Sequence, residues 1–247
     1  MNRIIVFALM FFCMTMQIEA QTLSEEEVTA KMYQAFELNK AAKKAEALEL
    51  FLIVGENTKQ QRNEGERQVY VCSQTMACQC YELLGRYKEG YLLGKSLLQG
   101  KLNDTERKDV GHLYAMNGYM YACEFIQRDE KGRADYKRGR ELISEILPYS
   151  DGQVKEYAET KIPLSWYFEG AQYAMTQSYD EALSSYEEAL NGFRDLGRVS
   201  EEVDVLSGIA SVKAHLCKFD EAKRVYYQAF VLAHQNGKVN KQMDVLR

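Results

Sequence analysis

The side chains that most often perform catalysis or bind metals are scattered along this sequence. The three histidines, His112, His215 and His234, are isolated, and none has the second ligand or base close in sequence that such a site uses. The chain also has no His-Glu-x-x-His pair, no glycine-rich phosphate loop and no nucleophile-elbow serine. The sequence therefore predicts a non-enzymatic protein with no metal and no cofactor.

Acidic residues occur in adjacent pairs, such as Glu187–Glu188 and Glu201–Glu202. Adjacent positions on a helix point in different directions, so these carboxylates do not converge on a substrate. We interpret them as solvated charge on outward helix faces. An enzyme that uses a carboxylate in a groove is the minor alternative, and it predicts that turnover is lost when one carboxylate is changed.

The amino terminus has the pattern of a secretory signal peptide, predicted at residues 1–20. Arg3 gives a short positive start, an apolar run follows from Ile4 to Met16, and Ala20 is a small residue just before Gln21. The run is shorter than the roughly 20 apolar residues that span a bilayer. We expect cleavage and a periplasmic or extracytoplasmic location; a retained membrane anchor is the alternative.

Beyond this leader the chain has an odd number of cysteines, which leaves at least one free thiol in an oxidising compartment. Cys78 and Cys80 lack the spacing of a zinc or redox pair, and we expect them to be buried as small apolar residues. The one pair that we single out for a disulfide is Cys72 with Cys123.

Composition favours helices and argues against nucleic acid as the direct ligand. The chain is 46% hydrophobic and has only two prolines, Pro148 and Pro163, so most of it is free to be helical. The net charge is −5, and no basic run occurs.

A short pattern of alternating small and large residues recurs along the chain. Ala182, Tyr186 and Ala189 are followed 40 residues later by Ala222, Tyr226 and Ala229. Small residues begin each copy, at positions 47, 90, 139, 182 and 222. A period of this length predicts stacked helical hairpins, in which small residues let neighbouring helices approach closely.

The fourth copy carries the most complete motif. Its residues resemble the tetratricopeptide repeat at Trp166, Gly170, Tyr173, Ala182, Tyr186 and Ala189. Two features depart from that family's pattern: Glu169 stands where a leucine is usual, and the closing proline is missing. The copy ends in a longer loop, similar to the roughly 40-residue variant of the repeat.

The resemblance implies an all-α fold, a right-handed superhelical solenoid of about five helix pairs over residues 21–247. The pairs are predicted near 24–62, 66–102, 106–149, 151–198 and 200–237, with a truncated sixth at 238–247. We expect Pro163 to kink the helix predicted from Val154 to Gln177 or to break it into two pieces. The segment from Ser150 to Pro163 is therefore a candidate hinge.

In this family the first helix of each pair lines the concave surface, where ligands bind. Helical phase places an aromatic and methionine-rich set there, suited to a protein or peptide ligand. The set comprises Tyr33, Phe36, Met76, Gln79, Met116, Tyr119, Tyr167, Phe168, Ala171 and His215. The alternative is that several of these residues pack between repeats.

Exported repeats of this kind are similar to the sensor segments of Bacteroidetes-type regulators, in which an output domain follows a membrane helix. The chain ends at Arg247 inside a predicted helix, so we expect a membrane-tethered continuation or another chain that covers the last repeat. The leading hypothesis is a periplasmic, peptide-binding sensor in signal transduction. The alternative is a free periplasmic scaffold that assembles envelope proteins.

Overall fold

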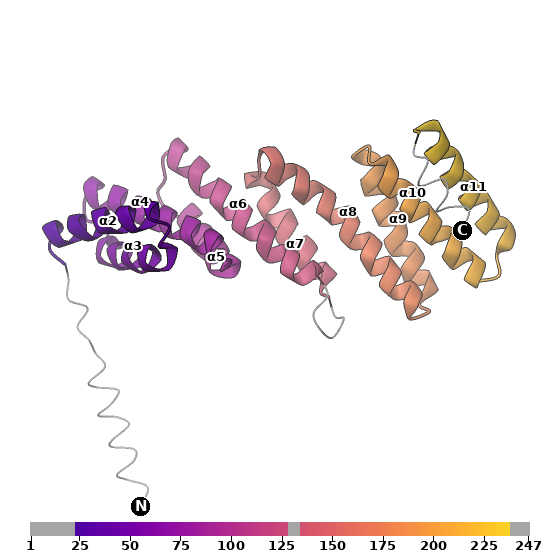
Figure 1. The fold of residues 1–247 in the computed structure, drawn as a ribbon, viewed down its shortest axis with the longest axis horizontal. Coiled ribbons are helices and arrows are strands. Elements are labelled where there is room, and N and C mark those ends of the chain that lie inside the picture. The colour runs from indigo at the N-terminus through magenta and orange to yellow at the C-terminus, as the bar shows by residue number, and fades with distance from the viewer. Residues whose placement is uncertain (1–22, 128–133, 238–247) are drawn as a thin grey trace, which may run out of the picture. The chain divides into compact units, whose positions relative to one another are not determined.

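The structure of the protein is a computed structural model that describes residues 23–127 and 134–237. Every regular element in these two ranges is helical (Figure 1). The helices are α2 (Glu25–Lys40), α3 (Lys44–Thr58), α4 (Glu64–Leu83), α5 (Tyr87–Leu98), α6 (Asp104–Ile126), α7 (Tyr136–Ile146), the 3-10 turn η1 (Leu147–Tyr149), α8 (Gly152–Met175), α9 (Tyr179–Asp195), α10 (Val199–His215) and α11 (Phe219–Gln235). The predicted all-α class with five helix pairs is confirmed.

These helices form two compact units. The N-terminal unit holds α2 to α4 and ends at Leu84; the C-terminal unit begins at Gly85 and holds α5 to α11. The division falls inside the helix pair predicted at 66–102, because α4 packs with α3 and α5 packs with α6.

In the N-terminal unit, α3 packs against both α2 and α4. Phe51 is fully buried, and its ring lies edge-on to Phe36 of α2 with centroids 5.4 Å apart. On the other side, Gly55 lets α4 come close, since a Cβ atom there would lie 1.7 Å from Nε2 of Gln74. The small residue inside α3 is thus a packing requirement.

In the C-terminal unit each helix packs against the next one along the chain, and α8 also contacts α10. One core cluster centres on Leu142, Ile143 and Ile146 of α7, all fully buried. A second cluster surrounds Tyr186 and Phe193 of α9. Successive hairpins that share continuous apolar cores are what a helical solenoid requires.

The turns between paired helices share one backbone feature. A residue in the left-handed region follows α2, α4, α8 and α10: Ala42, Gly85, Gln177 and Cys217, with φ of 60°, 70°, 62° and 58°. Only one of the four is glycine, although this region favours glycine. The repeat therefore keeps the shape of the turn without keeping its residue type.

Pro163 does not divide its helix. The helix α8 runs from Gly152 to Met175 with Pro163 inside it, so the predicted break into two pieces is wrong. The buried proline ring packs against α9 at Gly192, where a Cβ atom would lie 2.8 Å from Cβ of Pro163. Packing in this gap offsets the backbone hydrogen bond that proline removes. The hinge at Ser150–Pro163 stays a prediction.

The predicted burial of the cysteines is found in the structure, but the predicted disulfide is not. Cys78 and Cys80 are buried as predicted, and burial raises the pKa of the Cys78 thiol to about 12. Cys72 and Cys123 are both free, so the disulfide singled out above is not formed. Cys72 is exposed on α4 of the N-terminal unit, whereas Cys123 is buried within the C-terminal unit.

Two predicted segments lie outside the described residues: the leader at 1–20 and the truncated sixth pair at 238–247. Among the helices that are described, none has both the length and the apolar character needed to cross a membrane.

Candidate functional site

The predicted ligand-binding residues fall in both units. Tyr33 and Phe36 lie on α2, Met76 and Gln79 on α4, Met116 and Tyr119 on α6, Tyr167, Phe168 and Ala171 on α8, and His215 ends α10. All therefore lie on the first helix of a pair. The first four belong to the N-terminal unit and the other six to the C-terminal unit.

A depression of about 300 Å³ lies between α2 and α4 in the N-terminal unit. Its lining residues are Val28, Thr29, Met32, Tyr33, Phe36 and Val69. Tyr33 is 71% exposed, and Phe36 is half-buried against Phe51. This apolar depression thus contains two of the predicted residues, beside side chains that the sequence analysis did not single out.

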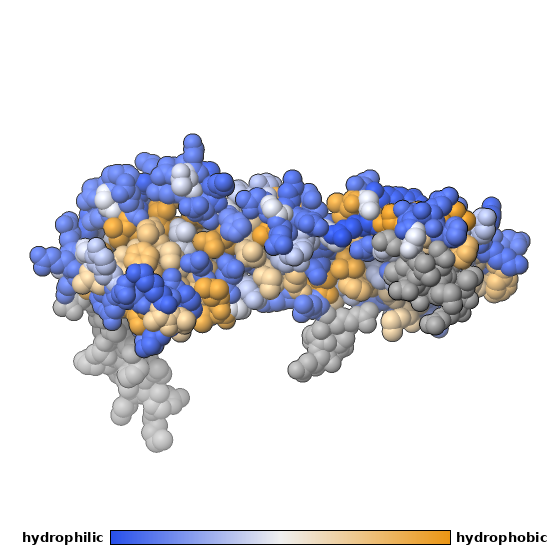
Figure 2. Space-filling model, turned by 45° about the horizontal axis from the view of Figure 1, so that its top comes forward, coloured by the Kyte–Doolittle hydropathy of each residue, from blue (hydrophilic) through white to orange (hydrophobic). Residues whose placement is uncertain are grey.

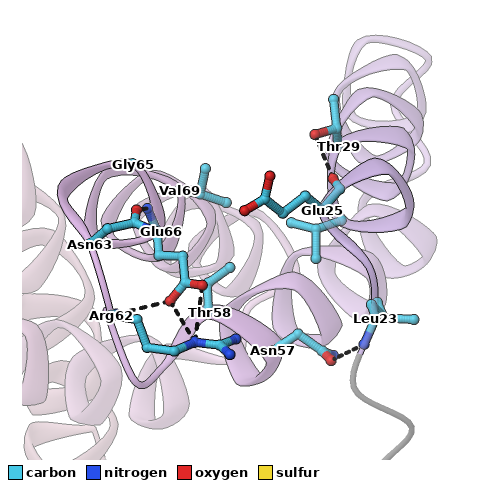
Figure 3. Close-up of a pocket in the computed structure, with 11 residues that line it drawn as sticks. Leu23, Glu25, Thr29, Asn57, Thr58, Arg62, Asn63, Gly65, Glu66 and Val69 are labelled. Atoms are coloured by element: carbon cyan, nitrogen blue, oxygen red, sulfur yellow. Dashed lines mark hydrogen bonds and ion pairs between the residues drawn. The ribbon is translucent and has the colours of Figure 1, made fainter.

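A second cavity, of about 290 Å³, continues the depression toward the amino-terminal ends of the same two helices (Figure 3). Both hollows are lined by Val28, Thr29 and Val69, so they adjoin each other, and together they are here called the α2–α4 groove. The polar cavity at its end is lined further by Leu23, Glu25, Asn57, Thr58, Arg62, Asn63, Gly65 and Glu66.

Helix caps hold the wall of the polar cavity in place. Ser24 forms a capping box with Glu27 at the start of α2, and Asn63 Oδ1 accepts a hydrogen bond from the Glu66 N–H at the start of α4, at 2.9 Å. The Leu23 N–H donates to Asn57 Oδ1 at 2.9 Å, which ties the chain before α2 to the end of α3. The cavity is therefore shaped before any ligand arrives.

Charged side chains converge in the same place. Glu66 accepts hydrogen bonds from both the backbone N–H and the Nε of Arg62, at 2.9 and 3.2 Å. Figure 3 shows the Glu25 carboxylate reaching into the cavity from the opposite side, and no ion pair of Glu25 occurs within the described ranges. The cavity thus presents one compensated and one uncompensated carboxylate.

Met76 and Gln79 continue the Val69 face along α4 at helical spacing, but they do not line either hollow. Met76 is half-buried and Gln79 is exposed. Cys72 lies between Val69 and Met76 at the same spacing and is exposed. These residues extend the surface beyond the apolar end of the groove.

In the C-terminal unit, four of the predicted ligand-binding residues pack against other side chains: Met116, Tyr119, Tyr167 and Ala171. Tyr119 stacks on Tyr157 with ring centroids 6.3 Å apart, and burial raises the pKa of Tyr119. Tyr167 lies 5.8 Å from Tyr186 and, like Ala171, packs against the core. Met116 also packs against a core cluster. The contacts of these residues are those expected if they pack between repeats, which is the alternative to a ligand-binding role.

Two predicted residues of that unit keep exposed surface. Phe168 is partly exposed beside Tyr167, with ring centroids 5.7 Å apart. His215 is exposed and stacks on Tyr179 at 5.9 Å. Figure 2 shows that hydrophobic side chains reach the visible surface in patches among hydrophilic ones. Tyr157, which lies in the candidate hinge and is not among the predicted ligand-binding residues, is also exposed.

Glu169, the departure from the family pattern, belongs to a buried ion pair. Arg140 Nη2 lies 2.7 Å from Glu169 Oε2, and the guanidinium carbon lies 3.4 Å from the centroid of the Trp166 ring. Arg140 also donates to Ser165 Oγ at 3.3 Å. This cluster joins α7 to α8 and needs a carboxylate where the family has leucine.

A second polar network joins α5, α6 and α7. Tyr91 and Tyr114 donate their hydroxyls to Glu145 at 2.9 and 2.7 Å, and Lys95 Nζ lies 2.6 Å from the same carboxylate. Burial acts to raise the pKa of Glu145, but the hydrogen bonds from Lys95 and the two tyrosines outweigh it, and the pKa is lowered. Because each polar group has partners inside the unit, we interpret this network as structural.

Within the described residues, no group of three His, Cys, Asp or Glu side chains is placed to hold a metal ion. The N-terminal unit instead offers an apolar channel with a charged end, which is suited to binding a chain segment.

No protein-family model matches the sequence, and no curated protein matches it. Among solved structures, the apo form of RapI is similar at 14% identity, with a TM-score of 0.36, over 86% of this chain and 72% of that one. A thermophilic TPR protein of Thermus thermophilus is similar at 16% identity and a TM-score of 0.34, over 89% of this chain and 98% of that one. The apo form of the quorum sensor NprR from B. thuringiensis is similar at 13% identity and a TM-score of 0.35, over 98% of this chain and 64% of that one. Scores this low establish neither family nor function, so the fold rests on the helices themselves.

Proposed function

We propose that this chain is a non-catalytic repeat module that binds a protein or peptide segment in the α2–α4 groove. The observation that carries the proposal is the channel itself: an apolar depression open to solvent at Tyr33 that continues into a polar cavity with fixed walls. Such channels between helices accept extended or helical segments, with apolar side chains supplying affinity and polar ends fixing orientation.

The test of binding uses two matched tyrosines. Tyr33 on α2 is 71% exposed and lines the groove, while Tyr227 on α11 is 69% exposed and belongs to the other unit. We expect Tyr33→Ser to reduce the recovery of peptides from a random displayed library and Tyr227→Ser to leave it unchanged. Equal recovery by both variants, with circular dichroism showing both folded, would place binding elsewhere and contradict the proposal.

We further propose that the module is exported and forms the sensing part of a longer signal-transduction protein. The predicted signal peptide and the likeness to exported sensor segments support this role. Fractionation of the native host with an antibody to the chain tests it: a periplasmic or membrane-bound product is expected, and a product confined to the cytoplasm would refute it. Stable co-purification with an envelope complex, without a tethered output domain, would favour the scaffold alternative.

A further inference from the structure

We infer that the α2–α4 groove selects an extended peptide that carries a cationic side chain four residues away from an apolar one. The cationic group lies in the polar cavity beside Glu25, and the apolar side chain lies in the depression formed by Tyr33 and Phe36. This inference rests on the proposed function and names the chemistry of its ligand.

The charges around the polar cavity favour a cation. Two acidic side chains are matched by ion pairs: Glu66 with Arg62 at 3.1 Å and Glu64 with Arg67 at 2.7 Å. Glu27 is bound to Ser24 and lies near Lys31, and these interactions lower its pKa. Glu25 and Glu26 have no cationic partner within the described part of the chain.

The dipoles of α2 and α4 do not remove the preference of the polar cavity for a cation. Two helix amino termini meet at the cavity, and each is equivalent to roughly half a positive charge. Their capping groups are already engaged, by Ser24 and Glu27 on α2 and by Asn63 on α4. Glu26 does not line the cavity, whereas Glu25 lines it and reaches into it without an ion pair in the described part of the chain, so the unpaired charge that a ligand meets there is negative.

Helix geometry sets the distance between the two subsites. Tyr33 and Phe36 lie eight and eleven residues after Glu25 on α2, which at the rise of an α-helix is about 12 to 16 Å. An extended peptide covers roughly 3.3 to 3.6 Å per residue and points every second side chain to the same face. A separation of four residues therefore reaches both subsites from one face, whereas a separation of three directs the two side chains to opposite faces.

The experiment uses the full chain and labelled octapeptides. The probe is a fluorescein-labelled Gly/Ser octapeptide with one lysine and one leucine four positions apart; matched peptides have glutamate or serine for the lysine, or a separation of three. Binding is measured by fluorescence anisotropy at low and high salt. We expect the four-residue lysine peptide to bind most tightly and to weaken as salt rises, because salt screens partly exposed charges.

Two variants isolate the cationic subsite. Glu25→Gln should weaken the lysine peptide by about three- to fivefold, the range for a partly exposed ion pair, and leave the serine peptide unchanged. Glu49→Gln is the control, because Glu49 is exposed on α3 and is not among the residues that line the groove. Equal binding of the glutamate peptide, or no effect of Glu25→Gln, would overturn the inference.

Two further outcomes separate this inference from the proposed function. If the lysine peptide fails while other library peptides bind in a Tyr33-dependent manner, the inference falls and the proposed function stands. If no peptide binds at all, both fall.

Discussion

The buried Arg140–Glu169 pair allows a quantitative test at a position where this repeat departs from the tetratricopeptide pattern. The two side chains are only 11% and 16% exposed, and the ion pair joins α7 to α8 at 2.7 Å. Replacing Glu169 by the family's leucine leaves the guanidinium buried without its carboxylate. Removal of one partner from a buried pair typically costs about 3 to 5 kcal/mol. Because Trp166 and Ser165 still contact the guanidinium, we expect the lower end, about 3 kcal/mol.

The assay is urea unfolding followed by tryptophan fluorescence. The chain has a single tryptophan, Trp166, and its ring lies directly under the Arg140 guanidinium, so the signal reports on the C-terminal unit. The double variant Arg140→Leu/Glu169→Leu removes both charges and should recover most of the lost stability, since apolar replacement of a whole buried pair is often neutral or favourable.

The control is an exposed ion pair on α7, the helix that carries Arg140. Arg138 lies 3.2 Å from Glu141 on α7, and both side chains are about half exposed. Glu141→Leu should change stability by less than about 0.5 kcal/mol. A Glu169→Leu variant as stable as the wild-type chain would refute the reasoning, because it would mean that the buried guanidinium does not need its carboxylate.

Three further predictions follow from the turns, the polar network and the thiols. Both Gln177 and Gly85 have positive φ, so Gln177→Gly should raise the stability of the fold by a few tenths of a kcal/mol and Gly85→Ala should lower it by about 1 kcal/mol. Thermal unfolding measures both changes, and a Gly85→Ala variant as stable as the wild-type chain would contradict the prediction. The Glu145 carboxylate has a lowered pKa in the folded chain, so its contribution to stability is present above its unfolded pKa, near 4.3, and is lost as pH falls through the folded value. Urea unfolding at a series of pH values should therefore show a weaker acid dependence for Glu145→Gln, and an identical dependence would count against the network. Burial raises the pKa of both Cys72 and Cys78, that of Cys78 to about 12, but only Cys72 is exposed. With a thiol reagent at neutral pH, Cys72 should therefore react in the folded chain and Cys78 only on unfolding; fast labelling of native Cys78 would show that it is accessible.

Sequence reasoning located the helix pairs because their signal is local. Small residues such as Ala47 and Ala182 recur at helical spacing, and both are fully buried. It failed at Pro163 because the compensating residue, Gly192, lies on the next helix and is not adjacent in sequence. The partner of Glu169 is similarly distant: Arg140 comes from the preceding helix pair. Pairwise contacts between repeats have no periodic signature.

The candidate site likewise combines residues that the helical pattern predicts with residues that only the folded structure brings together. Helical phase on α2 predicts that Tyr33 and Phe36 share a face, and both residues line one depression. The polar end of the groove is also lined by Asn57, at the end of α3, and by Arg62, in the loop that follows. A search limited to the first helix of each pair cannot include these residues, because the loop conformation decides whether they face the cavity.

Side-chain size explains why the first of the two surfaces is hollow. Between α2 and α4 the facing positions are Val28, Thr29 and Val69, whose short side chains leave the channel that the two cavities record. Between α6 and α8 the facing positions are Tyr119 and Tyr157, whose stacked rings occupy the space. The step from α2 to α4 therefore carries a hollow, whereas the step from α6 to α8 carries a packed aromatic contact. A hollow of this kind depends on which facing residues are small, and the positions shared with the tetratricopeptide pattern do not specify that choice.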